Sequence, residues 1–355
     1  MKKTSTIKES TTIDKSVYFN DVENSPTTIP ALNVALSGGL TEGLRKGLTI
    51  VAGNSRHFKS LFCLIIAEAY LKKHPESAVL FLDSEFGSPT AYFESVGIDT
   101  SRVLHVPVLN IEQLKHELVC QLNALEKDDK LIVICDSIGN LASLKEIQNA
   151  EEGSESQDMT RARMMKSLGR IVTPLLTMKN VPMLAVGHVY EELKTYGKTI
   201  LSGGTGLMLS ADNVWFIGRQ QDKDAGKDLV GYKFIINIEK SRHVKEKSKI
   251  PITVKFDGGL SKWSGLLEMA LESGHVRKPS NGWYSRCNIE TAELEEKKFR
   301  EKDTDNSDFW LPVLTDKSFQ KWVKDTYQVT NGKLISDEEI VDVYDNLEED
   351  TDDEV

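Results

Sequence analysis

The sequence predicts an α/β protein with a mostly parallel, twisted sheet, helices on both faces of that sheet and an antiparallel edge. Two observations lead to this fold class. Short, continuously apolar runs alternate with longer amphipathic stretches, which is typical of parallel strands that are buried on both faces. Three more apolar runs then follow one another with only turns between them, and such runs pair as antiparallel neighbours.

The strands and helices can be placed in order along the chain. A polar arm is followed by an apolar helical pattern, "ALNVAL", and a glycine-rich loop. The expected parallel strands are 47–53, 77–85, 130–137 and 181–188. The helices expected between them lie near 58–73, 90–96, 110–127 and 158–180. The last three strands are expected at 213–219, 232–240 and 251–259.

The domain organisation follows from the same pattern. We expect an N-terminal arm over 1–27, a core over 28–272, a small C-terminal region over 273–336 and an acidic, disordered tail over 337–355. A helical pattern starts near residue 264 and loses its period further on. In that region Trp283, Trp310 and Trp322 are the expected anchors on the core.

The composition is that of a soluble globular protein, with 39% apolar and 28% charged residues in a chain of 355. No apolar run approaches the roughly 18 residues that span a bilayer, and the charged N-terminus lacks the apolar stretch of a secretory signal. The four cysteines are widely spaced and fit no metal or disulfide pattern. We therefore expect a cytoplasmic protein without a membrane partner.

The net charge of −10 is concentrated at the C-terminus. Residues 337–355 hold eleven acidic residues and no basic one, so the remaining 336 residues carry a net charge of +1. Two hypotheses fit such a tail. Either it keeps the protein soluble, or it mimics the backbone of a nucleic acid and competes for a basic surface on the body.

One stretch comes within a residue of a phosphate-binding loop. The segment Gly53-Asn54-Ser55-Arg56-His57-Phe58-Lys59-Ser60 matches G-x-x-x-x-G-K-[ST] except at Phe58, and it joins an expected strand to an expected helix. Such a loop points backbone N–H groups at an anion, with Lys59 at the β- and γ-phosphates and Ser60 at Mg²⁺. We expect Phe58 to keep a negative φ and to turn its ring away from the phosphates. The loop therefore predicts a bound nucleotide with Mg²⁺; the alternative is a chance strand–turn–helix.

Polar residues at the ends of neighbouring strands support the nucleotide site. Asp83 and Glu85 end one strand, Asp136 and Ser137 the next, and His188 a third. Ligands of open α/β sheets bind at the carboxyl ends of the strands. Asp136 has the position of a metal-organising aspartate, and Glu85 is the candidate for polarising a water in line with the γ-phosphate. Taken singly, each such residue is often a cap or a solvated group.

Five longer strings carry a family resemblance. They are "FLDSEFGSPTAYFESVGID", "ICDSIGNLAS", "DMTRARMMKSLGRIVTP", "SGGTGLMLSAD" and "NIEKSRHVKEKSK", and together they resemble the RecA-type recombinases. The likeness is greatest to the UvsX branch of T4-like bacteriophages and runs from about residue 28 to 285. That branch has the same F-K-S departure in its phosphate loop. The resemblance implies a RecA-like P-loop ATPase core.

The resemblance implies a role for each residue around the phosphates. Lys59 and Ser60 would hold phosphate and Mg²⁺, and Asp136 would order the metal through water. Glu85 matches the glutamate that activates the hydrolytic water. His188 stands where many relatives sense the γ-phosphate with a glutamine, and a neutral imidazole can make the same hydrogen bonds.

Other residues of the resemblance concern the base and the neighbouring subunit. Tyr92 matches the tyrosine that stacks on adenine, and the alternative is a half-buried helix aromatic. Lys240 and Arg242 match two cations that reach across a subunit interface to the neighbour's γ-phosphate. Tyr18 and Phe19 form an aromatic segment that would dock on the next subunit; the alternative is a bare tail segment.

The resemblance also implies two DNA-binding loops, over about 144–160 and 189–206. The first is long and polar, so we expect it to lack regular structure without DNA. The DNA-binding candidates are Arg161, Arg163, Lys166, Arg170, Lys194, Lys198, Gly203, Gly204 and Gly206. Arg163 and Arg170 are seven residues apart and share a helical face, and the glycines would let backbone N–H groups approach phosphates. For the cations, the alternative is a solvated basic face.

Together these features imply an ATP-dependent DNA strand-exchange protein. It would polymerise as a helical filament on single-stranded DNA and pair that strand with homologous duplex DNA in recombination, repair and recombination-dependent replication. A single-strand-binding protein and a recombination mediator are the expected partners, in the cytoplasm of the host bacterium. Base pairing would supply the sequence specificity, so the protein needs backbone contacts only. The alternatives are a hexameric helicase or motor ATPase with the same core and a weakly catalytic, ATP-gated DNA scaffold.

Overall fold

The chain is described by a computed structural model over residues 10–20, 23–126, 128–153, 160–192, 198–223 and 226–329. The expected acidic tail over 337–355 lies outside the described residues, so both hypotheses about it stay predictions. Within the described parts of the chain, no helix combines the length and the apolar character needed to cross a membrane.

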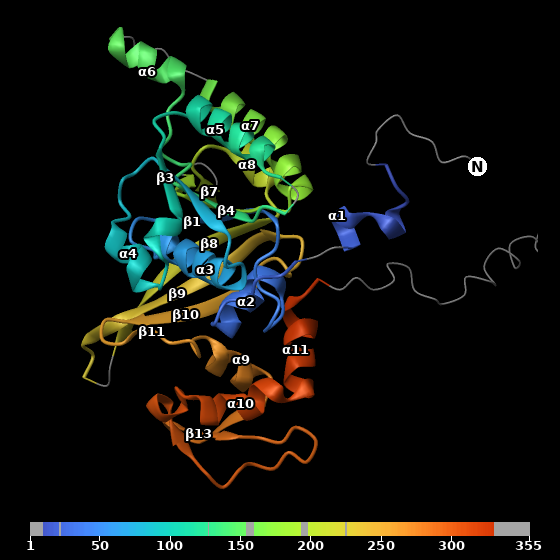
Figure 1. Ribbon diagram of the computed structural model, residues 1–355. Helices are drawn as coiled ribbons and strands as arrows, with labels where there is room; N and C mark the ends of the chain where they lie inside the picture. Colours follow the sequence, from blue (N-terminus) through green and yellow to red (C-terminus); the bar gives the residue numbers. More distant parts are fainter. Residues whose placement is uncertain are drawn as a thin grey trace, which may run out of the picture.

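The centre of the molecule is one large mixed sheet, which has nine strands within the described residues and is visible in Figure 1. Its strands are β1 (Gly47–Gly53), β2 (Ala78–Asp83), β3 (Val103–Pro107), β4 (Leu131–Asp136), β5 (Pro182–Gly187), β8 (Asn213–Lys223), β9 (Leu229–Ser241), β10 (Lys249–Lys255) and β11 (Gly259–Leu260). They follow the order β11-β10-β9-β8-β1-β5-β4-β2-β3. Neighbours from β8 to β3 are parallel, and β8 to β11 pair antiparallel. The predicted fold class is confirmed.

Helices cover both faces of the sheet, and the central strands are therefore buried on both sides. Successive side chains of a strand point to opposite faces. Ile50 of β1 belongs to the hydrophobic cluster of α5 (Ile111–Ala124) and α7 (Thr160–Met178). Its neighbour Val51 belongs to the other cluster, with α2 (Pro30–Ser37) and α3 (Lys59–Lys73). The remaining helices of the core and arm are α1 (Val17–Asn20), α4 (Thr90–Ser95), α6 (Leu144–Glu151) and α8 (Thr205–Ser210).

The edge strand β3 was missed by the sequence analysis. The side chains of Leu104 and His105 in this strand are exposed. An edge strand that faces solvent lacks the continuous apolar run by which the central strands were found. The sequence signal is therefore weak at this edge.

The C-terminal region packs on the cluster that also contains α2 and α3, at the lower end of the molecule in Figure 1. Its elements are β12 (Val276–Ser280), β13 (Trp283–Arg286), β14 (Phe299–Arg300), α10 (Ser307–Thr315) and α11 (Lys317–Tyr327), and they follow α9 (Leu266–Glu272) at the end of the expected core. The three strands form a separate small sheet. Trp310 is fully buried, and Trp322 is partly buried and packs against the cluster. The Arg300 guanidinium lies 4.0 Å from the ring centre of Trp283.

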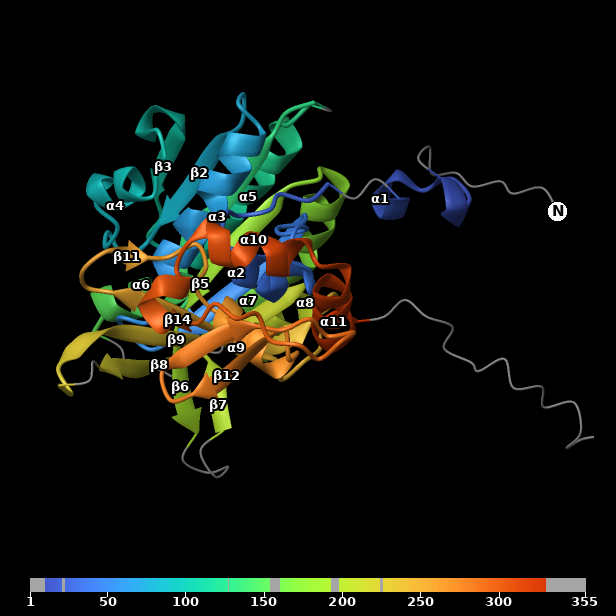
Figure 2. The ribbon, with the colours of Figure 1, turned by 90° about the horizontal axis from the view of Figure 1, so that it is seen from below.

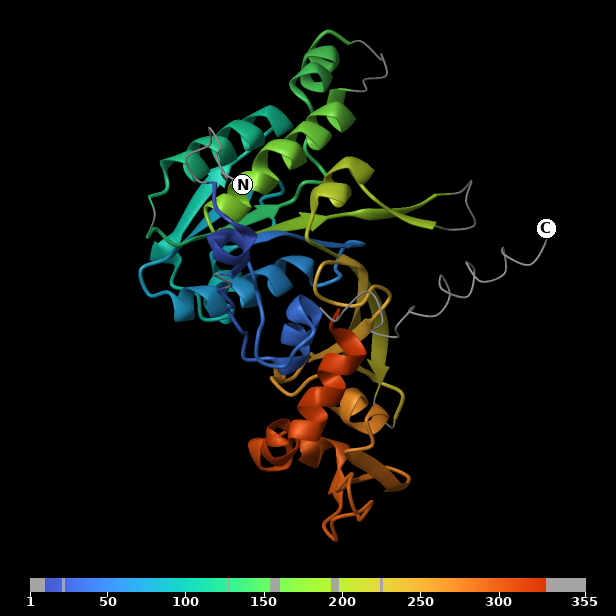
Figure 3. The same ribbon diagram turned by 90° about the vertical axis from the view of Figure 1, so that its right-hand side faces the viewer.

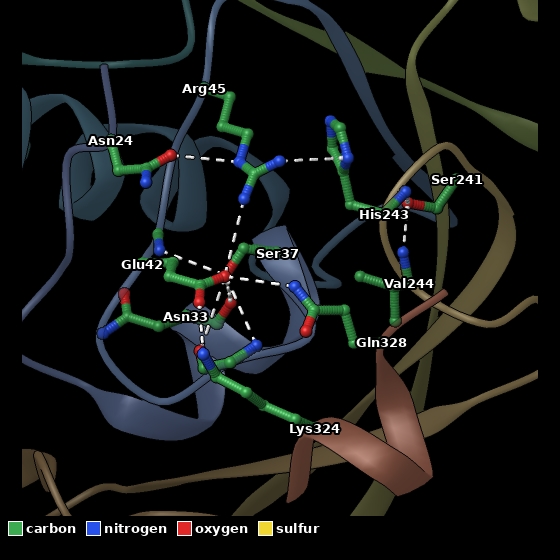
Figure 4. Close-up of polar contacts among 12 residues, drawn as sticks. Asn24, Asn33, Ser37, Glu42, Arg45, Ser241, His243, Val244, Lys324 and Gln328 are labelled. Atoms are coloured by element: carbon green, nitrogen blue, oxygen red, sulfur yellow. Dashed lines mark hydrogen bonds and ion pairs between the residues drawn. The ribbon is translucent and has the colours of Figure 1, made fainter. Parts of the chain in front are cut away.

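A polar cluster joins the C-terminal helix to the core, as Figure 4 shows. Glu42, in the loop after α2, pairs with Lys324 of α11 at 2.8 Å and accepts a hydrogen bond from Gln328 at 3.4 Å. Arg45 pairs with Glu42 at 3.5 Å and donates to Nδ1 of His243 at 3.2 Å. Burial, followed by the charge of Arg45, lowers the pKa of His243 to about 4, so its imidazole is neutral and can accept this bond. The cluster thus ties α11 to the segment that follows β9.

Both expected DNA loops contain regular structure. The helix α6 occupies 144–151, so the expectation of an unstructured first loop is wrong for these residues. Its start is fixed by a capping box between Ser143 and Glu146, which is a local sequence signal for a helix N-terminus. The second loop begins as an antiparallel hairpin of β6 (Val189–Glu192) and β7 (Lys198–Leu201). The hairpin projects from the body in Figures 2 and 3.

Candidate nucleotide site and DNA-facing elements

The strand register brings the predicted site residues to one edge of the sheet. Asp83 pairs with Asp136 across β2 and β4, and Ala52 pairs with Gly187 across β1 and β5. All four strands are parallel, so their carboxyl ends meet at the same edge. The phosphate loop, Glu85, Asp136 and His188 therefore leave the sheet side by side, as the sequence predicted.

The phosphate loop connects β1 to α3, and its lysine and serine begin the helix. Lys59 is 7% exposed, and its Nζ donates to the carbonyl oxygen of Asn54 at 2.8 Å. Burial lowers the pKa of this lysine, while the nearby carboxylates of Glu85 and Asp136 raise it. The Ser60 hydroxyl is hydrogen-bonded to the carboxylate of Asp136. A cation thus stands beside a hydroxyl–carboxylate pair at a helix N-terminus, a donor set that fits a nucleoside triphosphate with its metal.

Asp136 is almost fully buried, and this burial raises the pKa of its carboxyl, against the hydrogen bond from Ser60. Ser88 also donates to it, at 3.2 Å. Within the described residues, no three His, Cys, Asp or Glu side chains converge as a metal site. A magnesium ion at this position would accordingly take its ligands from Ser60, from water held by Asp136 and from phosphate oxygens, which is the usual arrangement for Mg²⁺.

Phe58 occupies the backbone conformation of the glycine that it replaces. Its φ is +62°, so the expectation of a negative φ is wrong. Its ring does point away from the loop, as expected: it stacks on Phe234 at a centroid distance of 5.1 Å and meets Phe62 edge-on at 5.2 Å. The left-handed conformation costs about 1–2 kcal/mol for a residue with a side chain, and the aromatic contacts of the partly buried ring offset this cost.

Two further residues of the loop contact β8. His57 Nδ1 donates to the carbonyl oxygen of Ile217 at 2.7 Å, and burial lowers the pKa of this imidazole. Arg219 Nη1 donates to the carbonyl oxygen of Arg56 at 3.2 Å. Three consecutive loop residues are therefore held by β8 and β9, which explains how the loop keeps its shape without the second glycine.

Three donors converge on one oxygen of Glu85. His188 Nε2 donates to Oε1 at 2.7 Å, Asn140 Nδ2 donates to it at 2.9 Å, and the Ser137 hydroxyl donates to the same atom. The bond from His188 is the main cause that lowers the pKa of Glu85; burial opposes it and the bond from Ser137 adds to it. The carboxylate is ionised near neutral pH and can accept a hydrogen bond or a proton from water.

The remaining strand-end residues have positioning contacts. Asp83 accepts from the backbone N–H groups of Glu85 and Phe86 at 3.0 and 2.8 Å and from His105 at 3.1 Å, so it shapes the turn that carries Glu85. Tyr92 lies on α4 and is 43% exposed, whereas the adjacent Phe93 is buried in the core.

Lys240 and Arg242 are not brought to the phosphate loop of their own chain. Lys240 pairs with Val214 at the amino end of β8, which is parallel to β1, so both cations lie at the opposite edge of the sheet. Lys240 Nζ donates to the carbonyl oxygens of Leu209 and Ala211, each at 2.7 Å, and of Met208 at 3.2 Å. Arg242 pairs with Asp212 at 2.7 Å.

The basic residues of α7 fall into two groups. The side chains of Arg163, Lys166 and Arg170 are exposed, as a nucleic-acid contact requires. Arg161 is partly buried, and its guanidinium donates to the carbonyl oxygens of Leu141, at 2.9 Å, and Gly139. Arg161 therefore has a different environment from the three residues with which the sequence grouped it.

The candidates of the second loop also have separate roles. Gly203 and Gly204 have φ of +97° and +88°, a conformation that favours glycine. Gly206 lies on α8, where a Cβ atom would come within 3.0 Å of Lys166 Cβ, so close helix packing explains this glycine. Lys194 lies outside the described residues, and Lys198 is placed in β7 by its backbone alone.

Comparison with known proteins gives the family. The C-terminal domain model of the bacteriophage T4 recombination and repair protein matches residues 263–323. The whole T4 protein is 48% identical over 340 residues, which cover 95% of this chain and 86% of the phage protein. The chain belongs to this family.

The chain is also similar to bacterial RecA proteins, at lower identity. The RecA protein of Syntrophus aciditrophicus is 25% identical over 75% of this chain and 76% of its own length. The RecA protein of Streptomyces ambofaciens is 26% identical over 74% and 69%, respectively. The core is therefore RecA-like, and the family to which the chain belongs is that of a recombination and repair protein.

Sequence reasoning missed two residues of this recombinase site. Asn140 donates to Glu85, and Ser88 donates to Asp136. Both lie inside strings that carried the resemblance, but neither belongs to a motif with a fixed chemical spacing. The signal that could have found Asn140 is its place four residues after Asp136, in a turn at the same sheet edge.

Proposed function

We propose that the chain is a DNA-dependent ATPase that forms a helical filament on single-stranded DNA, pairs that strand with homologous duplex DNA and exchanges the strands. The observation that carries this proposal is the convergence of Lys59, the Ser60–Asp136 pair and Glu85 at one sheet edge. Positioning and electrostatic stabilisation are the main tasks in phosphoryl transfer, and this arrangement suits them.

Phosphate binding and water activation belong to different residues in this proposal. Lys59 holds the β- and γ-phosphates of ATP together with the N–H groups of its loop. Ser60 and Asp136 hold Mg²⁺, which supplies charge neutralisation on the phosphates when bound. Glu85 orients the attacking water and takes its proton. The N–H of His188 that donates to Glu85 in this structure turns to the γ-phosphate when ATP is bound.

Filament contacts are assigned to residues away from the chain's own phosphate loop. Lys240 and Arg242 reach the γ-phosphate of a neighbouring subunit, because they lie at the edge opposite their own loop. In the arm, Phe19 is 65% exposed, and with Tyr18 it docks on the next subunit. A head-to-tail contact that does not close produces an open helix. Tyr92 stacks on adenine from its exposed position on α4.

Single-stranded DNA is bound through its backbone. Arg163, Lys166 and Arg170 contact phosphates from one exposed surface of α7, and the hairpin of β6 and β7 adds a second contact. A single-strand-binding protein and a recombination mediator act with the filament in the cytoplasm of the host bacterium.

A strand-exchange assay tests the proposal. Circular single-stranded DNA is coated with the protein in ATP and Mg²⁺, and joint molecules are counted with homologous and with heterologous linear duplexes. We expect joint molecules with the homologous duplex alone and ATP hydrolysis that depends on DNA. Hydrolysis without exchange, together with closed rings in electron micrographs, would support a hexameric motor instead.

A further inference from the structure

The turn formed by residues 139–141 touches both side chains that the proposal places at the γ-phosphate. Asn140 Nδ2 donates to Glu85 Oε1 at 2.9 Å. Gly139 approaches His188 so closely that an added Cβ would lie 3.0 Å from the imidazole Cδ2. Just before the turn, the N–H of buried Ile138 donates to the carbonyl oxygen of Val186 at 2.9 Å. The turn is thus fixed to β5 at its base.

The two elements expected to bind DNA, α7 and the β6–β7 hairpin, contact the same turn from its other side. Arg161, at the start of α7, donates from Nε to the carbonyl oxygen of Leu141 at 2.9 Å and from Nη2 to that of Gly139. Ser202, directly after β7, donates its hydroxyl to the carbonyl oxygen of Gly139 at 3.3 Å. The backbone N–H of Ser202 also donates to the carbonyl oxygen of His188 at 2.7 Å. Arg161, directly after the first expected DNA loop, and Ser202, within the second, therefore both contact the 139–141 turn beside Glu85.

The side chain of Arg161 has a different environment from the cations that follow it on α7. Its planar guanidinium spans two backbone carbonyls and is partly buried, whereas Arg163 and Arg170 are exposed. The fork of an arginine can bond two acceptors in fixed directions, which the single ammonium of a lysine cannot reproduce. The side chain of Arg161 is therefore suited to hold a backbone shape.

We propose that Arg161 and Asn140 are positioning residues that couple DNA binding to ATP hydrolysis through the 139–141 turn. The inference rests on the proposed function, and it removes Arg161 from the set of DNA contacts. A shift of α7 or of the β6–β7 hairpin on DNA moves the carbonyls that Arg161 and Ser202 hold. The same movement reorients the amide of Asn140, and with it the carboxylate of Glu85.

The test is Arg161→Lys, which keeps the positive charge and removes the planar guanidinium that bonds both carbonyls. In the full chain with single-stranded DNA, we expect the DNA-stimulated kcat for ATP to fall about 5–10-fold, the effect of losing one hydrogen bond of ordinary strength. The Kd for DNA and the KM for ATP stay within about twofold, because neither phosphate contact changes. Asn140→Ala should lower kcat in the same way. This second variant tests the role of the turn if the arginine variant folds poorly.

Matched variants separate coupling from binding. Arg277→Lys makes the same exchange at an exposed arginine of β12, outside the candidate sites, and should change neither kcat nor DNA affinity by more than about twofold. Arg163→Ala should raise the Kd for single-stranded DNA, because it removes an exposed phosphate contact. The double variant of Arg161→Lys and Asn140→Ala should lose no more activity than the worse single variant, because both act through one turn.

Two results would overturn the coupling role. One is DNA stimulation that survives Arg161→Lys and Asn140→Ala unchanged. The other is a loss of DNA affinity in Arg161→Ala that equals that of Arg163→Ala, which would make Arg161 a phosphate contact. A wild-type chain whose hydrolysis does not respond to DNA would overturn the proposed function, and the coupling role with it.

Discussion

The phosphate-binding edge and the DNA-facing elements of this core obtain their geometry in different ways. At the edge, each polar residue follows the end of a parallel strand, and the register of the strands sets its place, as with Asp83 beside Asp136. The DNA-facing elements begin beyond those strand ends. They are held by side chains that reach backbone carbonyls, such as Arg161 on Gly139 and Leu141.

The difference decides what a sequence pattern can predict. A strand that ends in a carboxylate is visible in a few consecutive letters, and the parallel sheet does the rest. The contacts of Arg161 join residues 20 and 22 positions apart, across a segment with no apolar period. A chemical pattern thus predicted which residues meet at the candidate nucleotide site, whereas the division of the α7 cations into two groups required coordinates.

The largest effect is expected at the phosphate edge. Lys59→Ala removes the buried cation beside the Ser60–Asp136 pair. We expect DNA-dependent hydrolysis to fall at least about 10²-fold and ATP-dependent filaments to be lost, since this charge faces the phosphates in both states. Steady-state hydrolysis and electron microscopy measure the two effects. Near wild-type hydrolysis would show that the loop is not the phosphate site.

Glu85→Gln separates chemistry from binding at the same edge. The amide keeps the shape of the side chain but has no proton-accepting carboxylate, so turnover should fall by roughly 10²–10⁴-fold. Binding of ATP and DNA should survive, and filaments should persist longer. Glu94→Gln, an exposed acid on α4, is the matched control. If the variant lost ATP binding instead, Glu85 would be a structural or metal-organising residue.

The DNA-facing region should respond through affinity. Arg163→Ala and Arg170→Ala are each expected to weaken single-stranded DNA binding by roughly 3–10-fold and to reduce the salt slope by about one ion. Affinity for ATP without DNA should not change. Lys72→Ala removes an exposed cation from α3, which packs on the other face of the sheet, as control. If the salt slope did not change, both arginines would be solvated surface residues that make no contact with DNA.

The smallest effect tests the backbone of the phosphate loop. Phe58→Gly and Phe58→Ala both remove the ring that packs on Phe234 and Phe62. At a φ of +62°, glycine should be the more stable replacement by about 1 kcal/mol, because alanine keeps a Cβ in the left-handed conformation. Thermal or denaturant unfolding measures the difference. With a negative φ the order would reverse.

The sequence predicted most of the sheet and much of the nucleotide site for a shared reason. Central strands buried on both faces are continuous apolar runs, and the site residues follow those runs directly. The exceptions have physical causes. The strand β3 is partly exposed and has no such run, and α6 starts at a capping box within a polar segment. The negative φ expected at Phe58 was wrong because contacts with β9, far along the chain, stabilise the left-handed conformation.

By itself, the sequence determined the order of the central strands and of the helices between them, the loop after β1 and the polar residues at the strand ends. These depend on patterns within a few residues, which any sheet of this class converts into one edge. Tertiary structure alone decided the backbone of Phe58, the place of Lys240 and Arg242 at the opposite edge and the attachment of Arg161 to the 139–141 turn. The reason is that each depends on partners from elements distant in sequence, and their approach is set by packing of the whole core.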